Sequence, residues 1–139
     1  MEASVVIGTS GWAYPEWRER FYRGEPVGHG GLVGDPVRGR EIAADSHAGN
    51  CLACHELPIP GIEAYGTIGP PLPGIASRLT EPQIRLRVVD TRNINPMSIM
   101  PGFYRDPRLI NRPGEAYRGR TFLTAQQVED VIAYLVTLK

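Results

Sequence analysis

The chain has 139 residues, enough for one domain with a hydrophobic core, and its 15 basic and 15 acidic residues give a net charge of zero. This balance gives no reason to expect nucleic acid as a partner, and no apolar run approaches the roughly 20 residues that span a bilayer. Most of the 16 glycines and 13 prolines lie between positions 24 and 115, which predicts a loop-rich middle that a disulfide or a cofactor must hold together.

The first 32 residues are predicted to form an extension outside the main domain, which we place at residues 33–139. The extension contains the clearest strand-like pattern, SVVIGTSGW at positions 4–12. Its start does not match a secretory signal, because position 2 is acidic, no basic region precedes the apolar run, and that run is only Val5–Ile7.

The first predicted helix begins after Asp35, a favourable N-cap residue, with Pro36 at the first helical position. Val37 and Ile42 are its main apolar positions. We expect it to end at Gly49, because glycine commonly stops a helix.

The segment CLACH, residues 51–55, contains both cysteines of the chain and matches C-x-x-C-H, the attachment signature of c-type haem. The thiols of Cys51 and Cys54 would form thioethers with the two vinyl groups, and the adjacent His55 would bind the iron. The alternatives are a redox dithiol, which would need a βαβ context, and half of a zinc site, which would need a second pair of ligands. The sequence shows neither, so we predict one covalently bound haem c.

Long loops rich in proline and glycine are predicted at 56–79 and 95–122, and loops of this length are uncommon unless they wrap a ligand. The first contains GPPLPG at residues 69–74. We expect the Pro70 carbonyl to accept the Nδ1–H of His55 and to fix the tautomer of that ring. Leu72 is expected to lie against the haem.

The second predicted helix lies in LTEPQIRLRVVDTRN, residues 79–93. Thr80 and Gln83 form a capping box, and Pro82 lies in the first turn. Ile84 and Val88 share one face of this helix.

The sixth iron ligand has four candidates in the sequence: Met97, Met100, His29 and His47. An open site is a further possibility, and both methionines could instead fill the core. We favour Met100, because Pro101 makes its approach rigid and a thioether ligand suits electron transfer. Phe103 and Tyr104 would then close the haem edge, while Met97 would pack elsewhere or stay exposed.

The third predicted helix lies in LTAQQVEDVIAYLVTLK, residues 123–139. Thr124 and Gln127 form another capping box. Its apolar residues recur at helical spacing: Val128, Val131, Ile132, Leu135 and Val136.

Four segments together, GNCLACH, IGPPLPGIASR, MPGFYR and LTAQQVEDVIAYLVTLK, resemble the class I cytochromes c. Among these they are most similar to SoxX, the small cytochrome subunit of the SoxAX complexes of bacterial thiosulfate oxidation. The resemblance covers about residues 33–139. It implies an all-α fold, the class I cytochrome c fold, with three main helices and long loops wrapped around one covalently bound haem.

The resemblance also implies roles for individual residues. Cys51 and Cys54 would be the thioether attachments, His55 the proximal ligand and Met100 the distal ligand. In the same fold, Gly39 on the first helix would meet the last helix near Tyr134, because only a small residue allows so close a crossing.

As a SoxX-like chain, the protein would accept electrons from a SoxA-like cytochrome subunit that carries the reactive cysteine. There thiosulfate is joined oxidatively to a cysteine of the SoxYZ carrier, and the electrons leave through a downstream acceptor. This chain would then be the non-catalytic subunit of an L-cysteine S-thiosulfotransferase complex, in the periplasm, where haem c is attached. The alternatives are a freestanding soluble cytochrome c and a haem sensor with an open sixth site.

The stretch IGTSGWAYPEW near the N-terminus resembles the first strand and loop of a widespread family of uncharacterised TIM-barrel-like bacterial proteins. A TIM barrel takes about 250 residues, so a strand here would have no sheet to join. We expect this extension to be foreign, through a gene fusion, a mis-called start or an assembly error. The alternative is an arm that packs on SoxA. Packing on the cytochrome core, with Trp12 and Trp17 buried, would contradict a foreign origin.

Overall fold

A computed structural model describes residues 32–139 of the protein. The expectations for the extension, including those for Trp12 and Trp17, lie outside the described residues. Within that range the chain forms helices and no strand, which confirms the all-α prediction. The α-helices are α2 (Pro36–Ala44), α3 (Ile75–Arg78), α4 (Glu81–Asp90) and α5 (Ala125–Leu135). No helix in this part of the chain has the length and hydropathy that a transmembrane span requires.

Helix α2 begins as predicted, with the Asp35 side chain accepting hydrogen bonds from the backbone amides of Val37 and Arg38. It ends at Ala44 and does not reach Gly49. The reason is local, because the Asp45 carboxylate accepts the amide of His47 at 2.8 Å and so offers the backbone an alternative to the helix.

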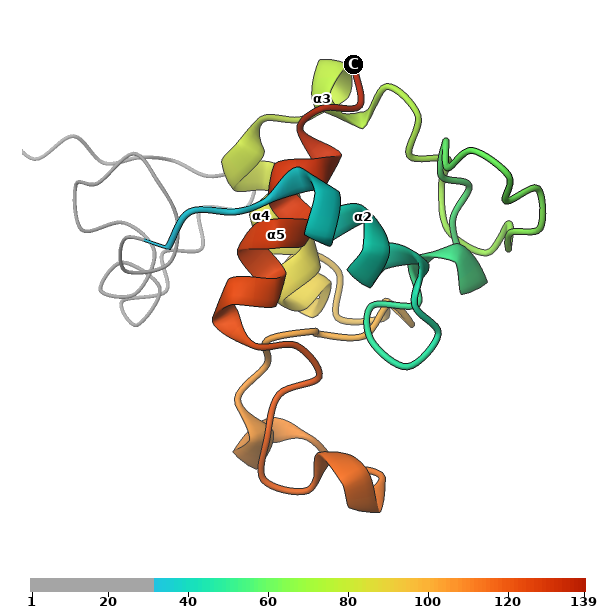
Figure 1. Ribbon diagram of the computed structural model, residues 1–139. Coiled ribbons are helices and arrows are strands. Elements are labelled where there is room, and N and C mark those ends of the chain that lie inside the picture. Colours follow the sequence, from blue (N-terminus) through green and yellow to red (C-terminus); the bar gives the residue numbers. More distant parts are fainter. Residues whose placement is uncertain (1–31) are drawn as a thin grey trace, which may run out of the picture.

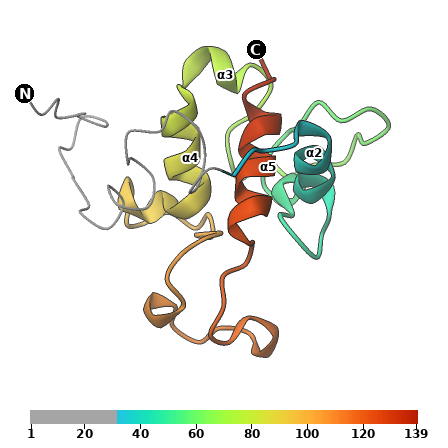
Figure 2. The same cartoon turned by 60° about the vertical axis from the view of Figure 1, so that its left-hand side comes forward.

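Helices α2 and α5 cross in close contact (Figures 1 and 2), and glycine makes this crossing possible. A Cβ atom at Gly39 would lie 1.8 Å from the carbonyl oxygen of Asp130 and 2.9 Å from the Cβ of Tyr134. The expected meeting of Gly39 with the last helix near Tyr134 is therefore confirmed. By contrast, Val37 is 57% exposed, so the buried face of α2 consists of small residues, Gly39 and Ala43.

We expect Gly39→Ala to destabilise the protein by roughly 1–3 kcal/mol, the usual cost of an overpacked contact. The new methyl group would clash with backbone atoms of α5, which cannot rotate away as a flexible side chain could. The higher helix propensity of alanine offsets at most about 1 kcal/mol of this cost. Denaturant unfolding of the holoprotein would measure this. Gly114→Ala is the matched control, because a Cβ there meets nothing closer than 3.9 Å. Equal stability of the two variants would contradict the argument.

Helices α4 and α5 begin at the two predicted capping boxes. The Gln83 side chain accepts the Thr80 amide at 2.9 Å, and the Gln127 side chain accepts the Thr124 amide at 2.9 Å. The helices pack through a core of buried aliphatic residues: Ile84, Val88, Val89, Val128, Val131, Ile132 and Leu135. A buried ion pair from Arg85 to Glu129, with N–O distances of 3.1 and 2.9 Å, fixes one helix against the other.

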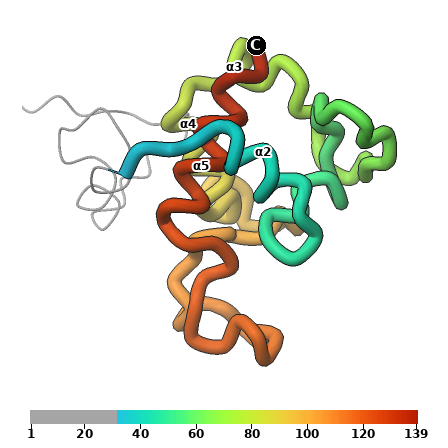
Figure 3. Tube along the Cα trace, viewed as in Figure 1, coloured from blue at the N-terminus to red at the C-terminus, as the bar shows by residue number. Residues whose placement is uncertain are grey.

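The two predicted loops account for most of the remaining chain, and the tube in Figure 3 shows their paths. The first leaves the CLACH segment and returns to α3, a four-residue helix that the sequence did not predict. The second runs from α4 to α5 and projects away from the helices in its middle part, where it forms the short 3-10 turns Pro107–Leu109 and Glu115–Tyr117. Its two ends meet where the Leu123 amide donates to the Phe103 carbonyl at 3.0 Å.

Candidate functional site

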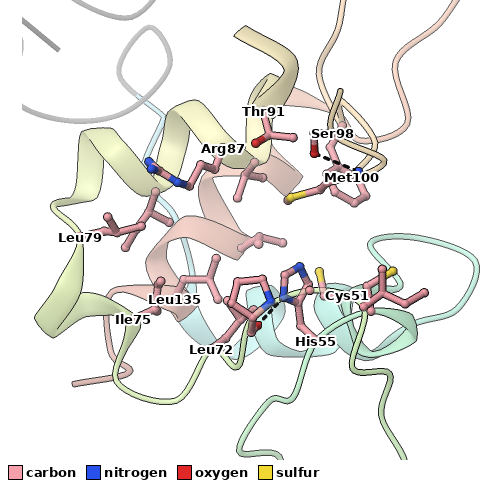
Figure 4. Close-up of a pocket in the computed structure, with 18 of the residues that line it drawn as sticks. Cys51, His55, Leu72, Ile75, Leu79, Arg87, Thr91, Ser98, Met100 and Leu135 are labelled. Atoms are coloured by element: carbon pink, nitrogen blue, oxygen red, sulfur yellow. Dashed lines mark hydrogen bonds between the residues drawn. The ribbon is translucent and has the colours of Figure 1, made fainter. Parts of the chain in front are cut away.

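A cavity of about 310 Å³ lies between the first loop and the α4 side of the molecule, and its wall is largely apolar (Figure 4). This volume is within the range of small-molecule and cofactor sites. Seven of the eight predicted site residues line it: Cys51, Cys54, His55, Pro70, Leu72, Met100 and Phe103. The eighth, Tyr104, is half-buried and packs against the core, away from the cavity wall. The chain thus brings residues from two distant loops to one space.

The lower wall is built on the CLACH segment. Cys51–Ala53 form a 3-10 turn entered through Asn50 in the left-handed conformation (φ 47°), and the His55 amide donates to the Cys51 carbonyl at 2.9 Å. The following loop folds back onto this turn, because the Gly69 amide donates to the Cys54 carbonyl at 2.7 Å. These bonds place the GPPLPG segment directly beside the histidine.

The His55 side chain is buried, and its Nδ1 lies 2.7 Å from the Pro70 carbonyl oxygen. A carbonyl can only accept, so Nδ1 carries the hydrogen, and in the neutral ring the lone pair is on Nε2. This is the contact expected from the sequence, and it leaves one ring nitrogen available as a metal ligand in a fixed orientation.

Gly69 is a site residue that sequence reasoning missed. A Cβ atom at this position would lie 2.2 Å from Cε1 and 2.5 Å from Nδ1 of His55, so the imidazole packs against the bare backbone of the glycine. The only signal in the sequence is the glycine directly before Pro70, which a plain turn would also explain.

We expect Gly69→Ala to displace the His55 ring and to break its hydrogen bond to Pro70, because the new methyl group would overlap the imidazole. The loss of that bond alone corresponds to roughly 1–3 kcal/mol for an unsatisfied buried group. The yield of haem-stained protein and its visible spectrum would report the displacement. Gly114→Ala serves again as the control, and a Gly69→Ala spectrum identical to the wild type would contradict the contact.

Met100 faces His55 across the cavity. Figure 4 shows its thioether directed into the space from the wall opposite the imidazole. The Met100 amide donates to the Ser98 hydroxyl at 3.2 Å, and the chain beyond is anchored to α4 by the Phe103 amide, which donates to the Val88 carbonyl at 3.3 Å. The distal loop is therefore held by hydrogen bonds on each side of the methionine.

Two of the other candidates for the sixth ligand, Met97 and His47, do not line the cavity. Met97 is 86% exposed, and the His47 side chain is 94% exposed. His29 lies outside the described residues. Among the described candidates, only Met100 reaches the space in front of His55.

Cys51 does not have the properties of a redox-active thiol. Burial raises the pKa of the Cys51 thiol to about 12, whereas reactive cysteines have a lowered pKa. Within residues 32–139, no three His, Cys, Asp or Glu side chains gather in a way that could hold a metal ion, so the pair has no partners for a zinc site there.

The residues present fit a haem c. An apolar cavity offers room for the ring, two thiols line one edge, and an imidazole and a thioether face each other across the space. Because Gly69 has no side chain, the imidazole can lie flat against the backbone below the cavity.

Comparisons with known proteins agree with this geometry. The family model described as Cytochrome c matches residues 36–139. The crystal structure of SoxXA from P. pantotrophus is similar in fold and sequence, with a TM-score of 0.73 and 39% identity over 81% of this chain and 88% of that chain. No curated protein matches the sequence.

Proposed function

The chain belongs to the cytochrome c family, and from this premise we propose that it carries one haem c and serves as the SoxX-type electron-transfer subunit of a complex with a SoxA-like cytochrome. Cys51 and Cys54 are its thioether attachments, His55 is the proximal ligand and Met100 the distal ligand. The observation that carries the assignment is the facing pair of His55 and Met100 across an apolar cavity that both cysteines line.

The haem, when bound, supplies a one-electron redox centre whose potential depends on its axial ligands. The protein residues control that centre in three ways. Pro70 holds His55 in one tautomer and increases its basicity through the 2.7 Å hydrogen bond. Met100 contributes a thioether, which raises the potential of a haem. The apolar wall keeps water away from the ring.

The proposed partner follows from the similarity to SoxXA. In the reaction we propose for the complex, a sulfur–sulfur bond forms between thiosulfate and a cysteine of the SoxYZ carrier, and two electrons leave. This chain accepts them one at a time and passes them to a downstream acceptor. Its own thiols are consumed by the haem, so it contributes no catalytic cysteine. Since haem c is attached outside the cytoplasm, we place the complex in the periplasm.

Expression with an added signal peptide, together with the cytochrome c maturation system, tests this function. Haem staining should show a covalently bound haem, and the holoprotein should form a stable complex with a SoxA-like subunit. The oxidised protein should show the long-wavelength charge-transfer band of methionine–iron ligation. A holoprotein that does not bind the SoxA-like subunit would instead indicate a freestanding carrier. Absence of the charge-transfer band would indicate a sensor with an open sixth site.

A further inference from the structure

The cavity wall contains one permanently charged side chain among the described residues, that of Arg87 on α4. The remaining lining residues are mostly aliphatic or aromatic, apart from the site residues and two hydroxyls. Arginine remains charged in proteins at any accessible pH. Arg87 is half-buried at this wall, where an anionic group could form a charge-assisted hydrogen bond with it.

Arg87 has no carboxylate partner within residues 32–139, where each ion pair involves another basic residue. Two acids on α4 and α5, Glu81 and Glu129, are both bound by Arg85. Asp90 pairs with Arg105 at 3.3 Å. Arg87 donates from Nη1 to the Gln83 carbonyl at 2.9 Å, which uses one of its five N–H donors.

The place of Arg87 relative to the cysteines indicates which part of a bound haem c it would face. Figure 4 shows Arg87 and Leu79 at one side of the cavity and Cys51 at the other. In haem, the two vinyl groups lie on one half of the porphyrin and the two propionates on the other half. Thioethers to the two cysteines would therefore direct both carboxylates toward the side of the cavity where Arg87 lies.

We propose that Arg87 binds a haem propionate through a charge-assisted hydrogen bond and thereby raises the reduction potential of the iron. This proposal rests on the proposed function. Hydrogen bonds of arginine to carboxylates are among the strong ones in proteins. A fixed positive charge beside the ring favours the reduced form, which carries one positive charge fewer. Arg87 would act as a positioning residue through the propionate, without contact to the iron.

The test compares Arg87→Met with Arg40→Met in the holoprotein. Both remove one positive charge, but Arg40 is exposed on α2 and does not line the cavity. We expect Arg87→Met to lower the potential and to shift the propionate bending band in the resonance Raman spectrum. Arg40→Met should leave the band in place, and Arg87→Lys should restore most of the potential because it keeps the charge.

Unchanged values of both quantities in Arg87→Met would overturn the proposal. So would a potential shift equal to that of Arg40→Met with no change in the Raman band, since net charge alone would then explain it. The charge-transfer band of methionine ligation is recorded in the same samples. Its absence in the wild type would overturn the Met100 assignment, whereas its presence with an unshifted propionate band would overturn only the Arg87 contact. If Arg87→Met does not accumulate, Arg87→Gln takes its place, because it also removes the charge, and an unshifted band in Arg87→Gln decides against the proposal.

Discussion

His55→Ala is expected to abolish stable holoprotein. The substitution removes the proximal ligand and leaves the Pro70 carbonyl, which His55 Nδ1 approaches to 2.7 Å, without its donor. Loss of that hydrogen bond costs about 0.5–1.5 kcal/mol, and the vacated volume costs more because the packed neighbours of the buried imidazole cannot fully collapse. The loops on both sides of the cavity would then lack the group around which they close.

Haem staining of the expressed protein and circular dichroism on heating would measure this loss. His47→Ala is the matched control, because that side chain is 94% exposed and does not line the cavity. We expect it to behave as the wild type. A His55→Ala protein with normal haem content and an unchanged visible spectrum would show that the iron is held by another residue.

Met100→Ala is expected to give a folded holoprotein with an open sixth site. The charge-transfer band of the oxidised protein should disappear, and the potential should fall by a sizeable part of the roughly 0.8 V range that axial ligation covers in haem proteins. Imidazole should bind the oxidised variant at least tenfold more tightly than the wild type, since it no longer has to displace a thioether. That difference corresponds to about 1.4 kcal/mol.

Potentiometric titration and spectroscopic imidazole titration would measure these changes. Met97→Ala separates ligation from a general effect of losing a methionine, because Met97 is 86% exposed and belongs to the same loop. It should change neither quantity. An intact charge-transfer band in Met100→Ala would mean that the ligand was wrongly chosen.

Features set by neighbouring residues could be predicted well from the sequence. The capping boxes at Thr80 and Thr124 depend on side chains three positions apart, and both are present. The start of α2 depends on Asp35 and Pro36 in the same way. The CLACH motif is equally local, and five consecutive residues are enough to predict the haem c that the cytochrome c family implies.

Features set by tertiary packing were harder to predict. Val37 was expected to be a main apolar position of the first helix, but the close approach of α5 leaves room only for Gly39 and Ala43. Gly69 contacts His55 and Arg87 lines the cavity, and both placements can be recognised only in the folded structure. No pattern in the sequence distinguishes them from an ordinary turn glycine and an ordinary surface arginine.

Phe103 and Tyr104 are adjacent in the distal loop, but their side chains face different surroundings. Both amides donate to carbonyls at the end of α4, those of Val88 and Val89. Adjacent side chains along the chain point in different directions, and only Phe103 of the two lines the cavity. The sequence places both aromatic residues near the site but does not determine which one faces it.

The pairing of α2 with α5 makes enclosure of the cavity depend on both ends of the described chain. Arg38 on α2 binds Asp130 on α5 across a separation of 92 residues, so this contact joins segments from the beginning and the end of the described chain. Most residues that line the cavity lie between these two positions, and Val131 and Leu135 of α5 complete its wall. The CLACH turn is a short local segment, whereas the cavity wall requires α5, the last helix of the described chain. The motif that would tether a haem c can therefore form from local sequence alone, but the pocket that would enclose it cannot.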